Sequence, residues 1–127
     1  MNRRNVLDSS AFLAAVNFET GGEKVESLFT DSVMSSVNVA EVYTKFAERD
    51  INLEDSAAYF SKLGIETVDF DLAQARKCGE LRSLTRHLGL SLGDRACLAL
   101  AIQHNATAVT ADKNWEKLDL CKIELIR

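Results

Sequence analysis

The chain of 127 residues has a formal net charge of −4, with 46% hydrophobic and 27% charged residues. These values are typical of a soluble globular protein, and the length suits one domain with its own core across residues 1–127. No apolar run approaches the ~20 residues that cross a membrane. The negative charge argues against non-specific nucleic-acid binding by the whole surface, although a local basic patch is still possible.

The cysteines give a first indication of the compartment. Cys78, Cys97 and Cys121 form no CxxC pair and lack the spacing of zinc ligands. Asp8 interrupts the first apolar stretch of the chain, so we expect no secretory signal. We therefore expect reduced, mostly buried thiols in a cytoplasmic protein.

Strand-like and helical segments alternate along the chain. Short apolar runs predict strands over 5–7, 32–35, 66–70, 108–110 and 123–126. Apolar residues three and four apart predict helices over 9–17, 23–30, 39–49, 53–63, 72–87, 91–102 and 113–118. This alternation predicts an α/β fold of three layers, α/β/α, in which a mostly parallel sheet has helices on both faces.

Four acidic residues lie where an expected strand or loop meets the start of a helix. Asp8 and Asp112 close two short apolar strands, while Glu41 and Asp94 lie in the first turns of two helices. A parallel sheet gathers such junctions at one edge. Carboxylates gathered there without enough basic partners would repel one another, and a divalent metal is the simplest means of holding them together. The pattern therefore predicts metal-dependent phosphodiester chemistry at these four acids.

Each of these acids also has a purely structural explanation. Asp8 and Asp112 could cap the helices that follow them, and residues 38–41 and 91–94 have the spacing of capping boxes. For any one acid alone, capping is the favoured explanation. The convergence of all four favours the metal site, as does Gly93 directly before Asp94.

The residue types suit hydrolysis of a phosphodiester bond. Mg²⁺ prefers oxygen ligands and keeps several waters, and a metal-bound water becomes a usable nucleophile near neutral pH. Ser10 and Thr110 carry hydroxyls near the same edge, where they could orient a carboxylate or a phosphate oxygen. They could equally be the hydroxyls of a helix start and a strand end.

Four segments of the chain carry a resemblance to a known family: NVLDSSAFLA, SSVNVAEVYTK, GLSLGDRACLALA and VTADKNWEKLDL. In this order, and over essentially the whole chain, they resemble the PIN-domain ribonucleases, and more closely the VapC-type toxins of prokaryotic toxin–antitoxin pairs. The resemblance implies a PIN-like sheet of about five strands in the order 3-2-1-4-5. It also implies an endoribonuclease that cleaves RNA with Mg²⁺ or Mn²⁺, a homodimer, and a cognate VapB-type antitoxin that blocks the site.

The resemblance extends to single residues. It matches the metal-binding acids of the family to Asp8, Glu41, Asp94 and Asp112. It also matches Ser10 to the hydroxyl that often follows the first acid by two positions. Asn38 departs from the family, which commonly has threonine three residues before the second acid.

Basic residues near the third acid are candidates for RNA binding. Arg82 and Arg86 are four residues apart and share a helix face, and Arg95 follows Asp94 directly. Cations there could hold phosphates beside the metal, or they could form a solvated helix face. Trp115 could stack on a base, but we favour a core or interface role because it shares a short amphipathic turn with Leu118.

Two other functions are compatible with the same fold. A non-catalytic module could use it to bind RNA or a partner protein, although the intact set of acids favours the enzyme. A receiver domain or an aspartate phosphatase would carry an aspartate nucleophile. The phosphatase would show Asp-x-Asp after the first strand, where this chain has Asp8-Ser9-Ser10.

Overall fold

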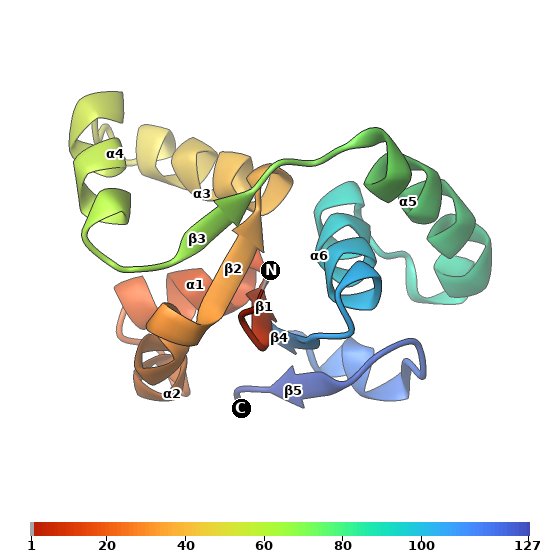
Figure 1. Ribbon diagram of the computed structural model, residues 1–127. Helices are drawn as coiled ribbons and strands as arrows, with labels where there is room; N and C mark the ends of the chain where they lie inside the picture. The colour runs from red at the N-terminus through yellow and green to blue at the C-terminus, as the bar shows by residue number, and fades with distance from the viewer. Residues whose placement is uncertain (1) are drawn as a thin grey trace.

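A computed structural model describes residues 2–127. A sheet of five strands in the order β3-β2-β1-β4-β5 crosses the molecule, and every pairing in it is parallel (Figure 1). This confirms the expected α/β fold and its strand order 3-2-1-4-5. The strands are β1 Asn5–Leu7, β2 Ser32–Ser35, β3 Glu66–Val68, β4 Thr107–Thr110 and β5 Ile123–Leu125.

Helices connect the strands within the described residues. The α-helices are α1 Ser9–Val16, α2 Gly22–Leu28, α3 Ser36–Glu48, α4 Leu53–Ser61, α5 Leu72–Thr85 and α6 Leu92–Gln103. Short 3₁₀ turns follow as η1 Phe29–Asp31, η2 Arg86–Leu88 and η3 Lys113–Lys117. Within residues 2–127, none of the helices is long and apolar enough to span a membrane.

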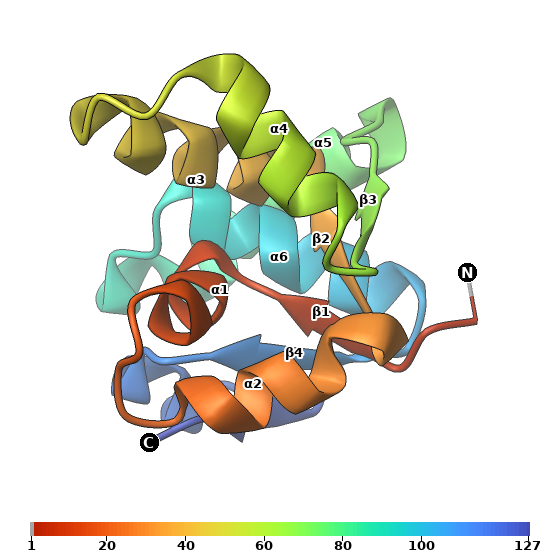
Figure 2. The same cartoon turned by 90° about the vertical axis from the view of Figure 1, so that its left-hand side faces the viewer.

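The core has two halves, one on each face of the sheet. Successive strand residues point to opposite faces, so Val6 and Leu7 of β1 enter different halves. Val6 lies in the half that α5 and α6 cover, and Leu7 lies in the half that α1 to α4 cover (Figure 1). Figure 2 shows β1 and β4 side by side in the middle of the molecule, where Val6 pairs with Ala108.

Most predicted boundaries agree with the structure to within two residues. The clearest error concerns α3, which begins at Ser36 rather than at residue 39 because the Ser35 hydroxyl accepts a hydrogen bond from the N–H of Val37. Glu41 therefore lies in the second turn of α3, and the capping box expected over 38–41 is wrong. The strand expected over 66–70 ends at Val68, since the N–H of Phe70 turns to the Ser36 hydroxyl.

Two expectations about buried side chains are confirmed. Trp115 is fully buried, so it belongs to the core and is not available to stack on a base. The thiols of Cys78, Cys97 and Cys121 are unpaired, and burial raises the pKa of each one.

Candidate metal centre

Asp8 lies where β1 passes into α1, and its side chain is only 3% exposed. Its Oδ1 accepts hydrogen bonds from the N–H of Ala11 at 2.8 Å and from the Ser10 hydroxyl at 2.7 Å. Its Oδ2 accepts a hydrogen bond from the Thr110 hydroxyl at 2.5 Å. Asp8 is therefore the N-cap of α1, as expected, and both predicted supporting hydroxyls bind it directly.

Glu41 reaches the start of α1 from the second turn of α3. The Ser9 hydroxyl donates a hydrogen bond to Glu41 Oε1 at 3.0 Å, and Asn38 Nδ2 donates to the same oxygen at 2.8 Å. Because Ser9 follows Asp8 in the chain, the first of these bonds brings the two acids to one region. Neither Ser9 nor Asn38 stood out as a site residue from spacing alone, although Ser9 is a hydroxyl residue beside a candidate acid.

The start of α6 brings Asp94 and Gly93 to the same region. The N–H of Asp94 donates to the Ser91 hydroxyl while Asp94 Oδ2 accepts from the N–H of Ser91, so the predicted capping box is confirmed. Gly93 lies directly against Glu41, and a Cβ atom added there would overlap both carboxylate oxygens. Glycine at this position permits the close approach of α6 to Glu41.

Asp112 follows β4 and is linked to Asp8 through Thr110. Its Oδ1 accepts from the N–H of Asn114 at 2.9 Å and so caps η3, as expected. Its own N–H donates to Thr110 Oγ1 at 3.1 Å. Ser10 completes this connection, since its hydroxyl lies 3.3 Å from that of Thr110 and accepts a hydrogen bond from the N–H of Ala111.

The electrostatics indicate that Asp8, Glu41 and Asp94 lie near one another. Burial raises the pKa of Asp8 from its ordinary value of 3.8 to about 6, the hydrogen bonds from Thr110, Ala11 and Ser10 oppose this rise, and the charge of Asp94 adds to it. The pKa of the buried Cys97 thiol is raised well above its ordinary range by burial first, and then by charges that include those of Asp8, Asp94 and Glu41. In the described part of the chain, the ion pairs of the structure include none of the four acids.

The side chains stand in their capping conformations rather than around a common point. Among residues 2–127, no three His, Cys, Asp or Glu side chains are grouped so as to hold a metal ion. The reason is visible in the hydrogen bonds, because Asp8, Asp94 and Asp112 each bind a backbone N–H of the local helix start. The donor set is nevertheless all oxygen, and no ion pair among residues 2–127 neutralises it, which is the chemistry that suits Mg²⁺ or Mn²⁺.

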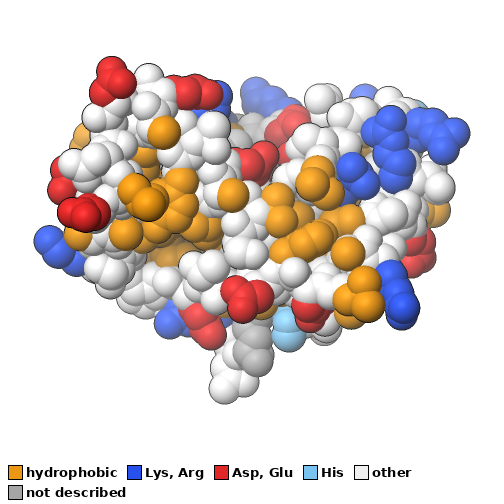
Figure 3. All heavy atoms as spheres, turned by 90° about the horizontal axis from the view of Figure 1, so that it is seen from above, with side chains coloured by type: hydrophobic (Ala, Val, Ile, Leu, Met, Phe, Trp, Pro, Cys, Tyr) orange, Lys and Arg blue, Asp and Glu red, His pale blue; other side chains and the backbone are white. Residues whose placement is uncertain are grey.

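The predicted RNA-binding arginines divide into two kinds. Arg82 on α5 and Arg86 in η2 are exposed. The Arg95 guanidinium instead donates to the carbonyl oxygens of Cys78 and Ser91, at 2.9 and 3.3 Å, and so fastens α6 to α5. Figure 3 shows Lys and Arg side chains gathered at the end of the molecule that carries α5.

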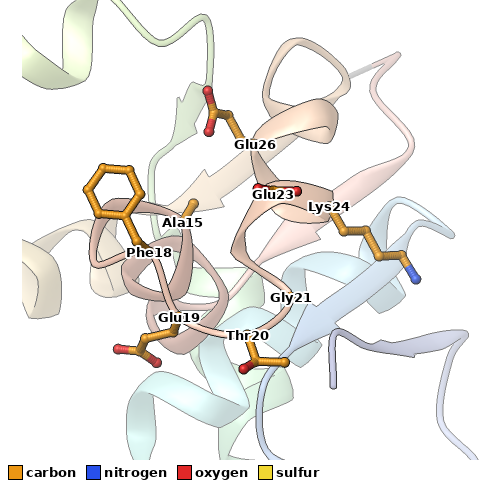
Figure 4. Close-up of a pocket in the computed structure, with 8 residues that line it drawn as sticks. All are labelled: Ala15, Phe18, Glu19, Thr20, Gly21, Glu23, Lys24 and Glu26. Atoms are coloured by element: carbon orange, nitrogen blue, oxygen red, sulfur yellow. The ribbon is translucent and has the colours of Figure 1, made fainter.

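A large concavity of the surface lies away from the four acids. It has a volume of about 470 Å³ and lies between the end of α1 and the start of α2 (Figure 4). Phe18 on its rim is 93% exposed and has a φ of +56°, in the left-handed region that aromatic residues rarely adopt. Glu19, Glu23 and Glu26 line the same concavity. The only signal of Phe18 in the sequence is an aromatic residue directly after a helix end.

Comparison with known proteins gives a family and a shared fold. The family model of the PIN domain matches residues 6–120. A search of curated proteins finds no match. A toxin–antitoxin complex from Klebsiella pneumoniae superposes with a TM-score of 0.77 at 14% identity, over 97% of this chain and 98% of that one.

Two further solved structures resemble the chain. VapBC2 from Rickettsia felis, bound to a DNA fragment from its promoter, has a TM-score of 0.72 at 20% identity, over 94% of this chain and 96% of that one. VapC20 from Mycobacterium tuberculosis, a toxin that cleaves the sarcin-ricin loop, has a TM-score of 0.69 at 16% identity, over 94% and 98%. At these identities the structures show that the fold is shared.

Proposed function

The chain belongs to the PIN domain family, and on that premise we propose that it is a metal-dependent endoribonuclease, the VapC-type toxin of a toxin–antitoxin pair. One observation carries the proposal. Asp8, Glu41 and Asp94, from three separate segments, approach one another in a single hydrogen-bonded region, and no ion pair among residues 2–127 includes any of them. Capping alone does not require this convergence. We take residues 1–127 as one PIN domain that acts in the cytoplasm.

In the proposed reaction the four acids bind the metal, and neighbouring hydroxyl groups orient two of them. Asp8, Glu41, Asp94 and Asp112 would hold Mg²⁺ or Mn²⁺, and the bound ion would supply an acidified water to attack the RNA phosphodiester bond. Thr110 and Ser10 hold the Asp8 carboxylate in one orientation, and their hydrogen bonds favour its ionised form. The Ser9 hydroxyl donates a hydrogen bond to Glu41 and so orients its carboxylate. These hydrogen bonds hold each carboxylate near the proposed site, and binding of the ion would require the capping side chains to turn toward a common point.

We assign contacts with RNA phosphates to Arg82 and Arg86. Both are exposed near the loop that leads to Asp94, whereas Arg95 is engaged with two backbone carbonyls. The cleavage of the sarcin-ricin loop by VapC20 supports RNA as the substrate class. Cations at the edge of an otherwise acidic protein would draw the RNA backbone toward the acids.

We also propose a cognate VapB-type antitoxin as partner, and a homodimer as the assembly. The VapBC complexes among the similar structures support the partner. Most apolar residues of α1, α3 and α4 belong to the core and leave little surface for a partner: Phe12, Val42 and Phe46 are buried, and Leu13, Val16 and Phe60 are half-buried. Tyr59 is 41% exposed, and it lies with the exposed Phe18 on the rim of one surface pocket, so this region is where we expect a partner.

Cleavage of total cellular RNA by the purified, antitoxin-free protein tests the proposal. The reaction would be run with Mg²⁺ or Mn²⁺, with EDTA, and with Asp94→Asn, which removes a proposed metal ligand. Asp71→Asn is the matched control, because Asp71 caps α5 through the N–H of Gln74 and lies outside the acid cluster. We expect discrete fragments that require both metal and Asp94 but are unaffected by Asp71→Asn.

A non-catalytic PIN-fold module that binds RNA or protein is the second candidate. One observation favours it, since three of the four acids act as helix caps in the structure. A folded protein that binds Mn²⁺ and RNA but leaves every RNA in the pool intact would support this candidate over the nuclease.

A further inference from the structure

Asn38 is a buried amide at the contact between α3 and α6. It is only 1% exposed. Its Nδ2 donates two hydrogen bonds, to Glu41 Oε1 at 2.8 Å and to the carbonyl oxygen of Gly93 at 3.1 Å. The second bond joins residues 55 positions apart in the chain. One amide group therefore ties the acid of α3 to the first turn of α6.

The orientation of this amide is fixed by its surroundings. Both hydrogens of Nδ2 point at oxygen atoms, so exchanging Nδ2 and Oδ1 would place oxygen against oxygen twice. Oδ1 is buried without a hydrogen-bond partner among the described residues. A buried acceptor without a partner destabilises the folded state. The orientation that lets Nδ2 donate two hydrogen bonds therefore leaves Oδ1 unsatisfied and lowers the stability of the fold.

Gly93 allows α6 to approach the Glu41 carboxylate of α3 closely. The Glu41 carboxylate lies so close to Gly93 that no side chain would fit between them. Asp94 is the next residue, and its N–H and carboxylate are fixed by the capping box with Ser91. A bond from Asn38 to Gly93 thus sets the distance between the acid of α3 and the acid of α6.

We propose that Asn38 is a positioning residue that holds Glu41 and Asp94 at the separation required for a shared divalent cation. The inference rests on the proposed metal-dependent function and adds a residue that acts through Glu41 rather than on the ion. A threonine at this position has one hydroxyl hydrogen, so it can donate to Glu41 or to Gly93 but not to both. The asparagine therefore hydrogen-bonds to α3 and α6 at the same time, which a single hydroxyl group cannot do.

The test compares Asn38 with a second buried amide that has the same bonding pattern. Gln74 is 2% exposed, its Nε2 donates to Asp69 O and Gln103 Oε1, and its Oε1 also lacks a partner among the described residues. Mn²⁺ dissociation constants would be measured by titration calorimetry for the wild type, Asn38→Ala, Asn38→Thr and Gln74→Ala. Urea unfolding of each variant would report stability separately.

We expect Asn38→Ala to raise the Mn²⁺ dissociation constant about 10-fold or more, the usual effect of removing a group that orients a metal ligand. Gln74→Ala should leave it unchanged although it also loses stability. Asn38→Thr should fall between the wild type and Asn38→Ala, and it provides the comparison if Asn38→Ala does not fold. Wild-type affinity in both Asn38 variants would overturn the role of Asn38. Absence of Mn²⁺ binding by the wild-type protein would instead overturn the proposed metal site itself.

Discussion

The Thr110 hydroxyl donates a hydrogen bond to Asp8 Oδ2 from the neighbouring central strand, at a distance of 2.5 Å. The same hydroxyl oxygen accepts the N–H of Asp112. A single side chain therefore connects the acids that follow β1 and β4. Its donor is directed at a carboxylate whose pKa is already raised by burial, which gives Thr110 a measurable effect on the ionisation of Asp8.

Thr110→Val should move the pH profile of RNA cleavage to higher pH. The hydrogen bond from Thr110 lowers the pKa of Asp8, so its loss lets that pKa rise above about 6 and leaves less carboxylate to bind a cation near neutral pH. The pH dependence of the initial rate at subsaturating Mn²⁺ checks this, because protons and the cation then compete for Asp8. Thr107→Val on the same strand is the control, since Thr107 lies opposite Asn5 at the start of β4, and an equal shift in both variants would contradict the assignment.

Asp8→Asn should stabilise the protein near neutral pH and much less in acid. The folded state raises the pKa of Asp8 from 3.8 to about 6, so the folded state binds more protons than the unfolded state between these values and loses stability as pH rises through them. Above this window the ionised Asp8 lowers the free energy of unfolding by on the order of 3 kcal/mol. Asparagine does not titrate and still caps a helix well.

Urea unfolding of the wild type and Asp8→Asn checks this expectation at about pH 7.5 and about pH 4.5, which lie above and within the window. The difference in the free energy of unfolding should shrink at the lower pH. A difference that is the same at both pH values would mean that Asp8 does not titrate in the window.

Gly93→Ala should remove most cleavage activity and Mn²⁺ binding, because the added Cβ atom would displace the Glu41 carboxylate from the start of α6. Gly79→Ala is a matched control in α5, where an added Cβ meets nothing within 4 Å. The control should raise the free energy of unfolding by about 0.5–1 kcal/mol, the helix preference of alanine over glycine, and leave activity intact. Full activity in Gly93→Ala would show that the close approach is not required.

Chelation should abolish cleavage without unfolding the protein. In the structure Asp8, Glu41 and Asp94 are all satisfied by hydrogen bonds from the protein, so the fold does not depend on an ion to neutralise them. Differential scanning fluorimetry with EDTA and with Mn²⁺ checks this. The melting temperature should rise as Mn²⁺ is added, because the ion binds only the folded state, and a collapse of the fold in EDTA would contradict the expectation.

Arg82→Ala should weaken RNA binding and reduce the salt dependence of the affinity by about one unit of log–log slope. The measurement uses Asp94→Asn as the background, so that the RNA is not cut during titration. Arg95→Ala is the comparison, since its guanidinium holds α6 to α5 through two carbonyl oxygens. It should lower stability rather than the salt slope. An unchanged slope in Arg82→Ala would count against Arg82 as a phosphate contact.

Those features of the site that depend on a local sequence pattern could be predicted from the sequence. Asp8 and the pair Ser91 and Asp94 could be recognised because capping is decided within four residues. The contacts of Asn38 could not, since they depend on how α3 packs against α6. The start of α3 differs from the prediction because Ser35, the last residue of β2, also serves as the helix cap.

The central place of β1 has a consequence for how the protein folds. Its neighbours are β2 and β4, and the β4 partner of Val6 is Ala108, near the other end of the chain. Closing so long a loop is slow, and until it closes one edge of an apolar strand is open to other chains. The same event aligns Thr110 with Asp8. A partly folded chain is therefore prone to aggregate and lacks the contact between Thr110 and Asp8, so the acid site and resistance to aggregation arise in one step.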